Sequence, residues 1–148
     1  SGYQPLGGVF VGRTALNALE RDPDFFLRHG YTYSGHSAVC AAALKNLEII
    51  ERDGLIERAK HVGKRLSDGL HSLAADGIID SVRGAGAIWA AGLKPDQNCV
   101  TIRDIMIKRG VIARSINADT NAFCPPFVIT DQQIDKLLDI FAAAAQGK

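Results

Sequence analysis

Apolar residues recur at helical spacing between residues 37 and 75. Alanine-rich turns at 41–43 open this stretch. The apolar positions that continue it are Leu55, Ala59, Val62, Leu66, Leu70 and Leu73. Residues three and four apart share one face of a helix. Asp53-Gly54 interrupts the pattern, and Gly77 is typical of a helix end. We therefore predict helix almost throughout residues 37–75, with a break or kink at Asp53-Gly54.

The segment before residue 37 has a mixed pattern. The apolar run Val9-Phe10-Val11 lies between glycines and predicts a short strand over residues 7–12. Residues 13–20 predict a short helix that ends before Asp22-Pro23. These elements are too few to enclose a core, so we expect the strand to belong to a larger sheet.

After residue 77 the pattern alternates between strands and helices. Strands are predicted at 78–82, 87–93, 111–116 and 123–129, with a turn at 83–86, a polar loop at 117–121 and helices from 100 to 109 and after Thr130. Pro125-Pro126 requires an edge or a bend in the last strand. Thr130 and Gln133 have the spacing of a capping box. The apolar face of the last helix comprises Ile134, Leu137, Leu138, Phe141, Ala142 and Ala145. The predicted class is α/β (α+β), in three parts: 1–36, 37–76 and 77–148.

Composition narrows the functional classes. The 148 residues are 47% hydrophobic and 22% charged with a net charge of +1, and no basic or acidic block stands out. We therefore expect no nucleic-acid or membrane partner. Cys40, Cys99 and Cys124 are widely spaced. We expect them to be buried thiols in a reducing compartment rather than disulfide or metal ligands. The chain begins without methionine or a signal-peptide pattern, and we expect a fragment.

Four motifs together resemble the class III, ω-transaminase-like aminotransferases. The first is Ser1-Gly2-Tyr3-Gln4-Pro5-Leu6-Gly7-Gly8, and the second is His29-Gly30-Tyr31-Thr32-Tyr33-Ser34-Gly35-His36 with the alanine-rich turns after it. The third is Val82-Arg83-Gly84-Ala85-Gly86. The fourth joins Ile112-Ala113-Arg114 to Pro125-Pro126-Phe127-Val128-Ile129-Thr130. Each motif alone is weak, but their common order covers the whole chain.

The resemblance implies the C-terminal part of a pyridoxal-phosphate (PLP) enzyme of fold type I. Residues 1–36 would end the large cofactor-binding domain, residues 37–76 would form the connecting helix, and residues 77–148 the small domain. The Schiff-base lysine of the family would lie upstream of Ser1, so the chain alone is expected to be inactive. The resemblance also implies a cytoplasmic homodimer that acts on small amines and keto acids.

Three residues of this chain carry implied roles. The resemblance assigns Thr32 to the phosphate of PLP in the neighbouring subunit, with Tyr31 beside it at the dimer interface. A hydroxyl in a glycine-rich loop before a helix suits a phosphate. The alternative is that the Thr32 hydroxyl bonds its own turn. The resemblance makes Arg114 the clamp for a substrate carboxylate, a role that suits the planar guanidinium fork. The alternative is an exposed arginine on an edge strand.

Two other functions stay open at this stage. One is another fold-type I PLP enzyme, such as an aminomutase or a racemase. The other is a non-catalytic α/β dimerisation or binding module, which predicts a polar outer surface along residues 9–11 and along the long helix. The glycines of residues 83–86 lack the spacing and the lysine of a phosphate loop, so we interpret them as a turn. No histidine has the spacing of a metal site with Cys, Asp or Glu.

Overall fold

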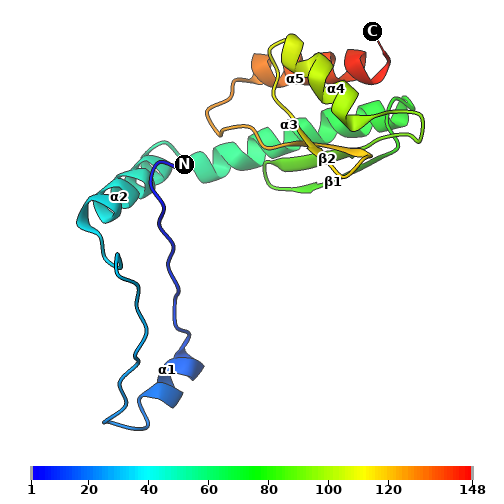
Figure 1. Cartoon of the computed structure of the whole chain (residues 1–148). Helices are drawn as coiled ribbons and strands as arrows, with labels where there is room; N and C mark the ends of the chain where they lie inside the picture. Colours follow the sequence, from blue (N-terminus) through cyan, green and yellow to red (C-terminus); the bar gives the residue numbers. More distant parts are fainter. Residues whose placement is uncertain (1, 148) are drawn as a thin grey trace. The chain divides into compact units, whose positions relative to one another are not determined.

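The computed structural model describes residues 2–147 (Figure 1). The chain divides into two compact units, the first ending at Arg52 and the second beginning at Asp53. The predicted division after residues 36 and 76 stays a prediction.

The first unit contains two helices, α1 (Arg13–Leu19) and α2 (Ser37–Arg52), and neither has a buried residue. Residues 7–12 form no strand, so that prediction is wrong. Val9 is 92% and Phe10 100% exposed. A strand needs a neighbour for its N–H and C=O groups, and the described part of this unit supplies none.

The predicted helix break lies where Asp53-Gly54 interrupts the apolar spacing. Helix α2 ends at Arg52, and α3 (Leu55–Ala75) begins after Gly54. Gly54 has a φ of 60°, in the left-handed region that costs glycine little. The apolar stripe of α3 is buried in the second unit, where Val62, Leu66 and Leu70 are fully inaccessible.

The second unit is a four-stranded antiparallel sheet covered by helices. The strands are β1 (Ser81–Ala85), β2 (Ile88–Gly92), β3 (Arg114–Ile116) and β4 (Thr120–Phe123), in the order β1-β2-β4-β3. Helix α3 packs on β1 and β2, α4 (Cys99–Lys108) packs on β3 and β4, and α5 (Asp131–Ala145) packs on both helices (Figure 1). The rings of Phe123 and Phe141 meet in the core at 5.0 Å. This arrangement confirms the predicted α/β (α+β) class.

The first hairpin is displaced relative to its prediction. Strand β1 covers 81–85 rather than 78–82, and the turn consists of Gly86-Ala87 rather than residues 83–86. Gly86 has a φ of 53° and makes the turn, whereas Gly84 lies within β1 opposite Trp89. A Cβ on Gly84 would approach Trp89 Cδ2 to 2.5 Å. Gly84 therefore allows close ring packing, which the sequence pattern could not separate from a turn.

The second hairpin is also shorter than predicted. Strand β3 begins only at Arg114, and β4 covers 120–123 instead of 123–129. Asn117, at a φ of 53°, lies in the turn. The predicted loop over 117–121 is therefore wrong for Thr120 and Asn121, which are buried in β4. The strand ends before Pro125-Pro126 because proline has no N–H for the ladder.

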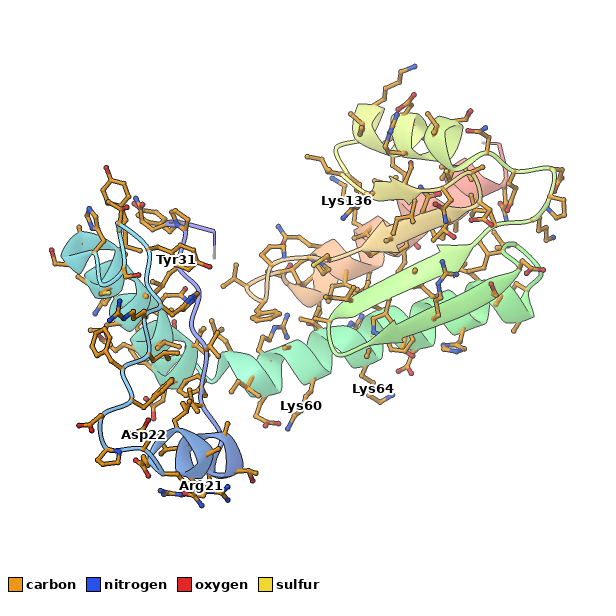
Figure 2. The ribbon with its side chains drawn as sticks, turned by 60° about the horizontal axis from the view of Figure 1, so that its bottom comes forward. Arg21, Asp22, Tyr31, Lys60, Lys64 and Lys136 are labelled. Carbon is orange, nitrogen blue, oxygen red and sulfur yellow. The ribbon has the colours of Figure 1, made fainter. Side chains whose placement is uncertain are left out.

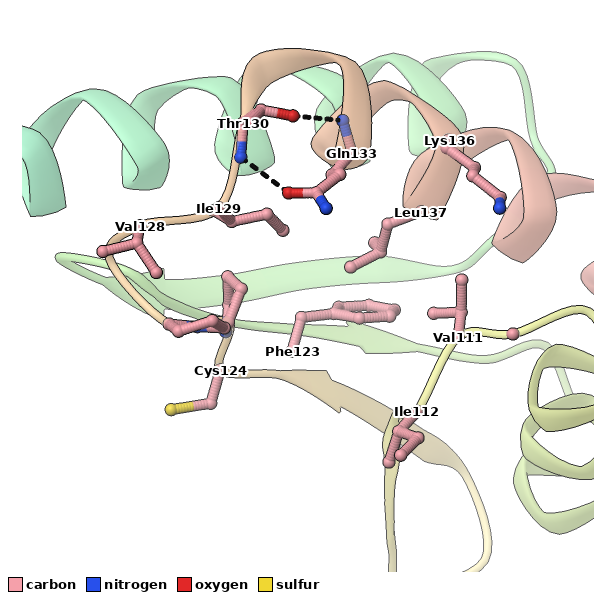
Figure 3. Close-up of a pocket in the computed structure, with 13 residues that line it drawn as sticks. Val111, Ile112, Phe123, Cys124, Val128, Ile129, Thr130, Gln133, Lys136 and Leu137 are labelled. Carbon is pink, nitrogen blue, oxygen red and sulfur yellow. Dashed lines mark hydrogen bonds between the residues drawn. The ribbon is translucent and has the colours of Figure 1, made fainter. Parts of the chain in front are cut away.

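Helices α4 and α5 each begin with a side-chain cap. The Asn98 side chain caps α4 by accepting from the backbone N–H groups of Val100 and Thr101, each at 3.0 Å. The predicted capping box of α5 is confirmed. Gln133 N donates to Thr130 Oγ1 at 3.2 Å, and Thr130 N donates to Gln133 Oε1 at 2.9 Å (Figure 3).

Candidate functional site

The loop that carries Tyr31 and Thr32 is a tight turn before α2. Ser34 N donates to Tyr31 O at 2.9 Å, and Tyr31 N donates to Ser34 Oγ at 3.0 Å. Gly35 adopts a φ of 70°, and α2 begins at Ser37. The Tyr31 ring meets His29 edge-on at 5.4 Å and is 77% exposed (Figure 2). The turn therefore fixes the backbone and leaves the aromatic ring accessible.

The Thr32 hydroxyl is not used by its own turn. Ser34 supplies the side-chain bond that closes the turn, and within residues 2–147 no hydrogen bond involves Thr32 Oγ1. Thr32 is exposed in the turn that precedes α2, which begins at Ser37. A free hydroxyl donor in this place suits the phosphate of a cofactor. The loop thus fits part of a PLP site, the part that holds the phosphate.

Arg114 opens β3 at the edge of the sheet. Its backbone pairs with Ala122 of β4, Ala122 pairs with Ala90, and Ala90 pairs with Arg83. Directly opposite residues share a face of a sheet, so these four side chains form one row. The helices cover the other face, where Phe123 is buried. The guanidinium of Arg114 is exposed, and no carboxylate among the described residues pairs with it.

Arg83 shares the open face with Arg114 but has internal partners. Its Nη2 donates to Thr120 Oγ1 at 3.1 Å, and that hydroxyl donates to Asp119 Oδ1 at 2.9 Å. Arg83 is thereby held against the sheet, whereas Arg114 remains available for a ligand. The sequence interpretation treated residues 83–86 as a turn and missed this contact.

An apolar groove of about 800 Å³ lies beside β4 and the start of α5 (Figure 3). Its walls come from the segment before β3, from residues 123–130 and from α5. Thr130, Gln133 and Lys136 contribute its polar groups. Sequence reasoning did not find this groove; the available signal was the pair of prolines that ends β4. Neither Thr32 nor Arg114 lines it.

A cluster of charges joins α3 to the first turn of α5. Arg58 Nη2 donates to Asp131 Oδ1 at 3.0 Å, and His61 Nε2 donates to Asp131 Oδ2 at 3.0 Å. These hydrogen bonds, the one from His61 first, hold the pKa of Asp131 below its ordinary value. Arg65 donates to Asp135, and this bond raises the pKa of the Arg65 guanidinium. The sequence interpretation did not single out these residues.

Other expectations concern metals, membranes and thiols. Within residues 2–147 no three His, Cys, Asp or Glu side chains gather as a metal site. No helix in that range has the length and apolar character to cross a membrane.

Cys99 is buried and Cys40 half-buried, as small apolar side chains often are. Cys124 is exposed, so its expected burial is wrong; it lies where β4 gives way to the prolines.

Comparison with known proteins covers nearly the whole chain. A sequence model of the class-III aminotransferases matches residues 2–145. The diaminobutyrate–2-oxoglutarate transaminase of Halomonas elongata is 35% identical over 93% of this chain and 33% of its own length. The putrescine–pyruvate aminotransferase of Pseudomonas aeruginosa is 31% identical over 95% of this chain and 32% of its own.

A solved structure shares the fold. A transaminase from a marine bacterium, Virgibacillus, superposes with a TM-score of 0.88 at 31% identity, over 99% of this chain and 36% of that one. The predicted fold-type I class is thus confirmed. The chain spans about a third of the length of the curated relatives it matches. On this evidence the chain belongs to the class III aminotransferases.

Proposed function

We propose that this chain acts within a PLP-dependent aminotransferase that moves an amino group from an amine or amino acid to a keto acid such as pyruvate. The proposal rests on the accessibility of the Thr32 and Arg114 side chains. Both are exposed, and neither side chain has a partner among the described residues. They are also the two groups to which the family resemblance assigns ligands.

Each side chain has a defined task in this proposal. Bound PLP supplies an electron sink for the amino-group chemistry. The Thr32 hydroxyl would donate to the cofactor phosphate, with Tyr31 beside it at the dimer interface. Arg114 grips the carboxylate of the keto acid through two parallel N–H bonds. No lysine of the chain occupies the Schiff-base position of the family, which would precede Ser1. We therefore propose that the 148 residues alone do not transaminate.

The proposed enzyme is a cytoplasmic homodimer in which the Thr32 loop reaches the cofactor of the neighbouring subunit. The exposure of Tyr31 and the absence of buried residues in α1 and α2 support such a partner. Exposed apolar surface of this kind marks contact regions. Sedimentation of the full-length enzyme with and without a Tyr31→Asp substitution tests the dimer, which the substitution should weaken.

Two alternatives are distinguished by their products. An aminomutase or racemase of the same fold would form no alanine from pyruvate. A non-catalytic module would bind without any amino transfer, and it predicts a polar outer surface along residues 9–11 and along the long helix. Val9 and Phe10 are instead apolar and exposed, which disfavours that module.

The direct test uses a full-length enzyme that contains this sequence. It is supplied with PLP, an amine donor and either pyruvate or 2-oxoglutarate, and the amino acid formed is quantified. We expect amino transfer, with PLP affinity reduced in Thr32→Ala and keto-acid affinity reduced in Arg114→Ala. Thr14→Ala and Arg103→Ala are matched controls, because Thr14 lies on α1 and Arg103 pairs with Asp104 on α4. The proposal fails if neither acceptor is aminated.

A further inference from the structure

The segment 124–130 connects β4 to α5 and forms one wall of the apolar groove (Figure 3). Pro125 and Pro126 have no N–H groups, so the segment cannot extend the β3–β4 ladder. Its one internal backbone bond runs from Ile129 N to Pro126 O at 3.0 Å. The carbonyls of Phe127 and Ile129 therefore need donors from outside the segment.

Those donors come from one side chain, Arg58 of α3. Its Nε donates to Phe127 O at 3.3 Å, and its Nη2 donates to Ile129 O. The same Nη2 donates to the carboxylate of Asp131 at 3.0 Å. One planar guanidinium thus holds two carbonyls of the segment and the first residue of α5. An ammonium group, which is a single point donor, could not occupy these directions together.

The segment is connected through β4 to the strand that carries Arg114. The segment follows β4 directly, and Ala122 of β4 is the backbone partner of Arg114. The groove also brings the segment next to Val111 and Ile112, which precede β3. Strand β3 has three residues, so few backbone hydrogen bonds hold it in position. Movement of the segment would therefore shift the strand edge from which Arg114 projects.

We infer that Arg58 is a positioning residue for the carboxylate-binding arginine. By holding segment 124–130 against α3, it fixes the β3–β4 edge at which the Arg114 guanidinium meets the substrate carboxylate. This inference rests on the proposed function, because Arg114 must bind a carboxylate for its position to matter. Arg58 itself touches neither Arg114 nor the open face of the sheet.

A role in stability alone would not explain this arrangement. The Arg58 and Asp131 side chains are 29% and 37% exposed, and ion pairs at such exposure contribute little to folding. Asp131 also has a second partner in His61. The two carbonyl contacts are what distinguish Arg58 from its neighbours.

The first test is residue-resolved amide exchange on the 148-residue chain. The reporters are Ile129 N–H, bonded to Pro126 O, and Thr130 N–H, bonded to Gln133 Oε1. Arg58→Met and Arg58→Lys should each accelerate both amides about tenfold, as expected for losing bonds to a charged donor. The control is Lys60→Met on the same helix (Figure 2). Among the described residues, the ion pair of Lys60 is with Glu57. Unchanged exchange in both Arg58 variants would overturn the inference.

The second test is kinetic and uses the full-length enzyme. Arg58→Lys should raise KM for the keto acid about tenfold and leave KM for an amine without a carboxylate unchanged. A purely structural role would lower the amount of active enzyme and change neither KM. In an Arg114→Ala background the Arg58→Lys effect should vanish, because the guanidinium it positions is absent.

The outcomes separate the two proposals. Additive effects of Arg58→Lys and Arg114→Ala, or equal KM changes for both substrates, would overturn the positioning role and leave the aminotransferase proposal standing. A wild-type enzyme that aminates no keto acid would overturn the proposed function, and the positioning role with it. A rise in KM for the keto acid alone, which disappears in the Arg114→Ala background, supports both the positioning role and the aminotransferase proposal.

Discussion

Gly63 in α3 is the position where the close packing of helix on sheet can be tested most directly. It is buried against the β1–β2 turn. A Cβ at Gly63 would lie 1.8 Å from Gly86 O and 2.6 Å from Gly86 C, far inside ordinary contact distances. The obstacle is backbone, so it cannot rotate away as a side chain can. Gly86 O also accepts a hydrogen bond from Trp89 Nε1 at 2.9 Å.

The expected cost of Gly63→Ala follows from three opposing terms. In an exposed helix the substitution would stabilise by about 1 kcal/mol, because alanine is the better helix former. Overpacking against a rigid neighbour costs about 1–3 kcal/mol, and loss of the Trp89 bond costs about 1 kcal/mol more. With the overpacking term near its upper end, the net destabilisation is about 2–3 kcal/mol. For a unit of this size that lowers Tm by roughly 10–20 °C.

Gly69→Ala on the same helix is the matched control. Its Cβ would lie 2.3 Å from Leu138 Cδ1, the end of a half-buried side chain that can change rotamer. The free energy of unfolding should therefore stay within about 1 kcal/mol of wild type. Urea unfolding would be followed by far-UV circular dichroism and by the fluorescence of Trp89, the only tryptophan. A Gly63→Ala chain as stable as Gly69→Ala would refute the packing argument.

Three further predictions concern ligands and charge. Arg114→Lys should raise keto-acid KM about tenfold while simple-amine KM stays constant, since a lysine cannot form the two parallel bonds; equal changes would remove Arg114 from the clamp. Because its pKa is lowered in the folded state, Asp131 should contribute a small stabilisation above about pH 4, as exposed pairs do, that is lost as pH falls through its folded pKa; urea midpoints at pH 7 and pH 3 should differ slightly less in Asp131→Asn. Borohydride treatment of the 148 residues with PLP should leave no stoichiometric adduct on a single lysine, as judged by mass spectrometry.

Helical spacing carried most of the fold information in the sequence. The stripe along α3 and the capping box of α5 were predicted from local patterns, because each depends on residues within a turn or two of one another. The break between α2 and α3 was also predicted, since Gly54 adopts a left-handed φ that other residues avoid. Local chemistry determines these features, and the sequence displays it directly.

The strand boundaries were harder to predict, because polar residues within a strand were assigned to a loop. Thr120 and Asn121 read as loop residues, yet they are 1% and 0% exposed in β4. Their side-chain donor and hydroxyl find partners in distant parts of the chain: Asn121 Nδ2 donates to Cys99 O at 3.0 Å, and Thr120 Oγ1 accepts from Arg83. Asn121 Oδ1 is buried without a partner among the described residues. Burial of a polar residue is tolerated when such partners exist. A single sequence does not show which distant group will serve.

The residues of the candidate site also differ in whether the sequence could identify them. Thr32 and Arg114 were identified through the family resemblance, because an exposed hydroxyl and an exposed guanidinium leave no pattern in spacing or composition. Arg58 was missed altogether, since its partners Phe127 and Asp131 lie 69 and 73 residues away in sequence. In the sequence Arg58 cannot be distinguished from a solvent-exposed charge on α3. Only the folded structure shows that segment 124–130 lies beside it.

The arginines of the second unit differ in whether their guanidinium groups have internal partners. Arg58, Arg65 and Arg83 each donate to groups of their own unit. Arg114 projects from the open face of the same sheet without such a partner among the described residues. Desolvating a guanidinium is costly unless an anion meets it, so a fold can keep an unpaired arginine only where water or a ligand reaches it. Internal pairing thus accounts for the first three arginines and leaves the Arg114 guanidinium open to a ligand, as the proposed clamp role requires.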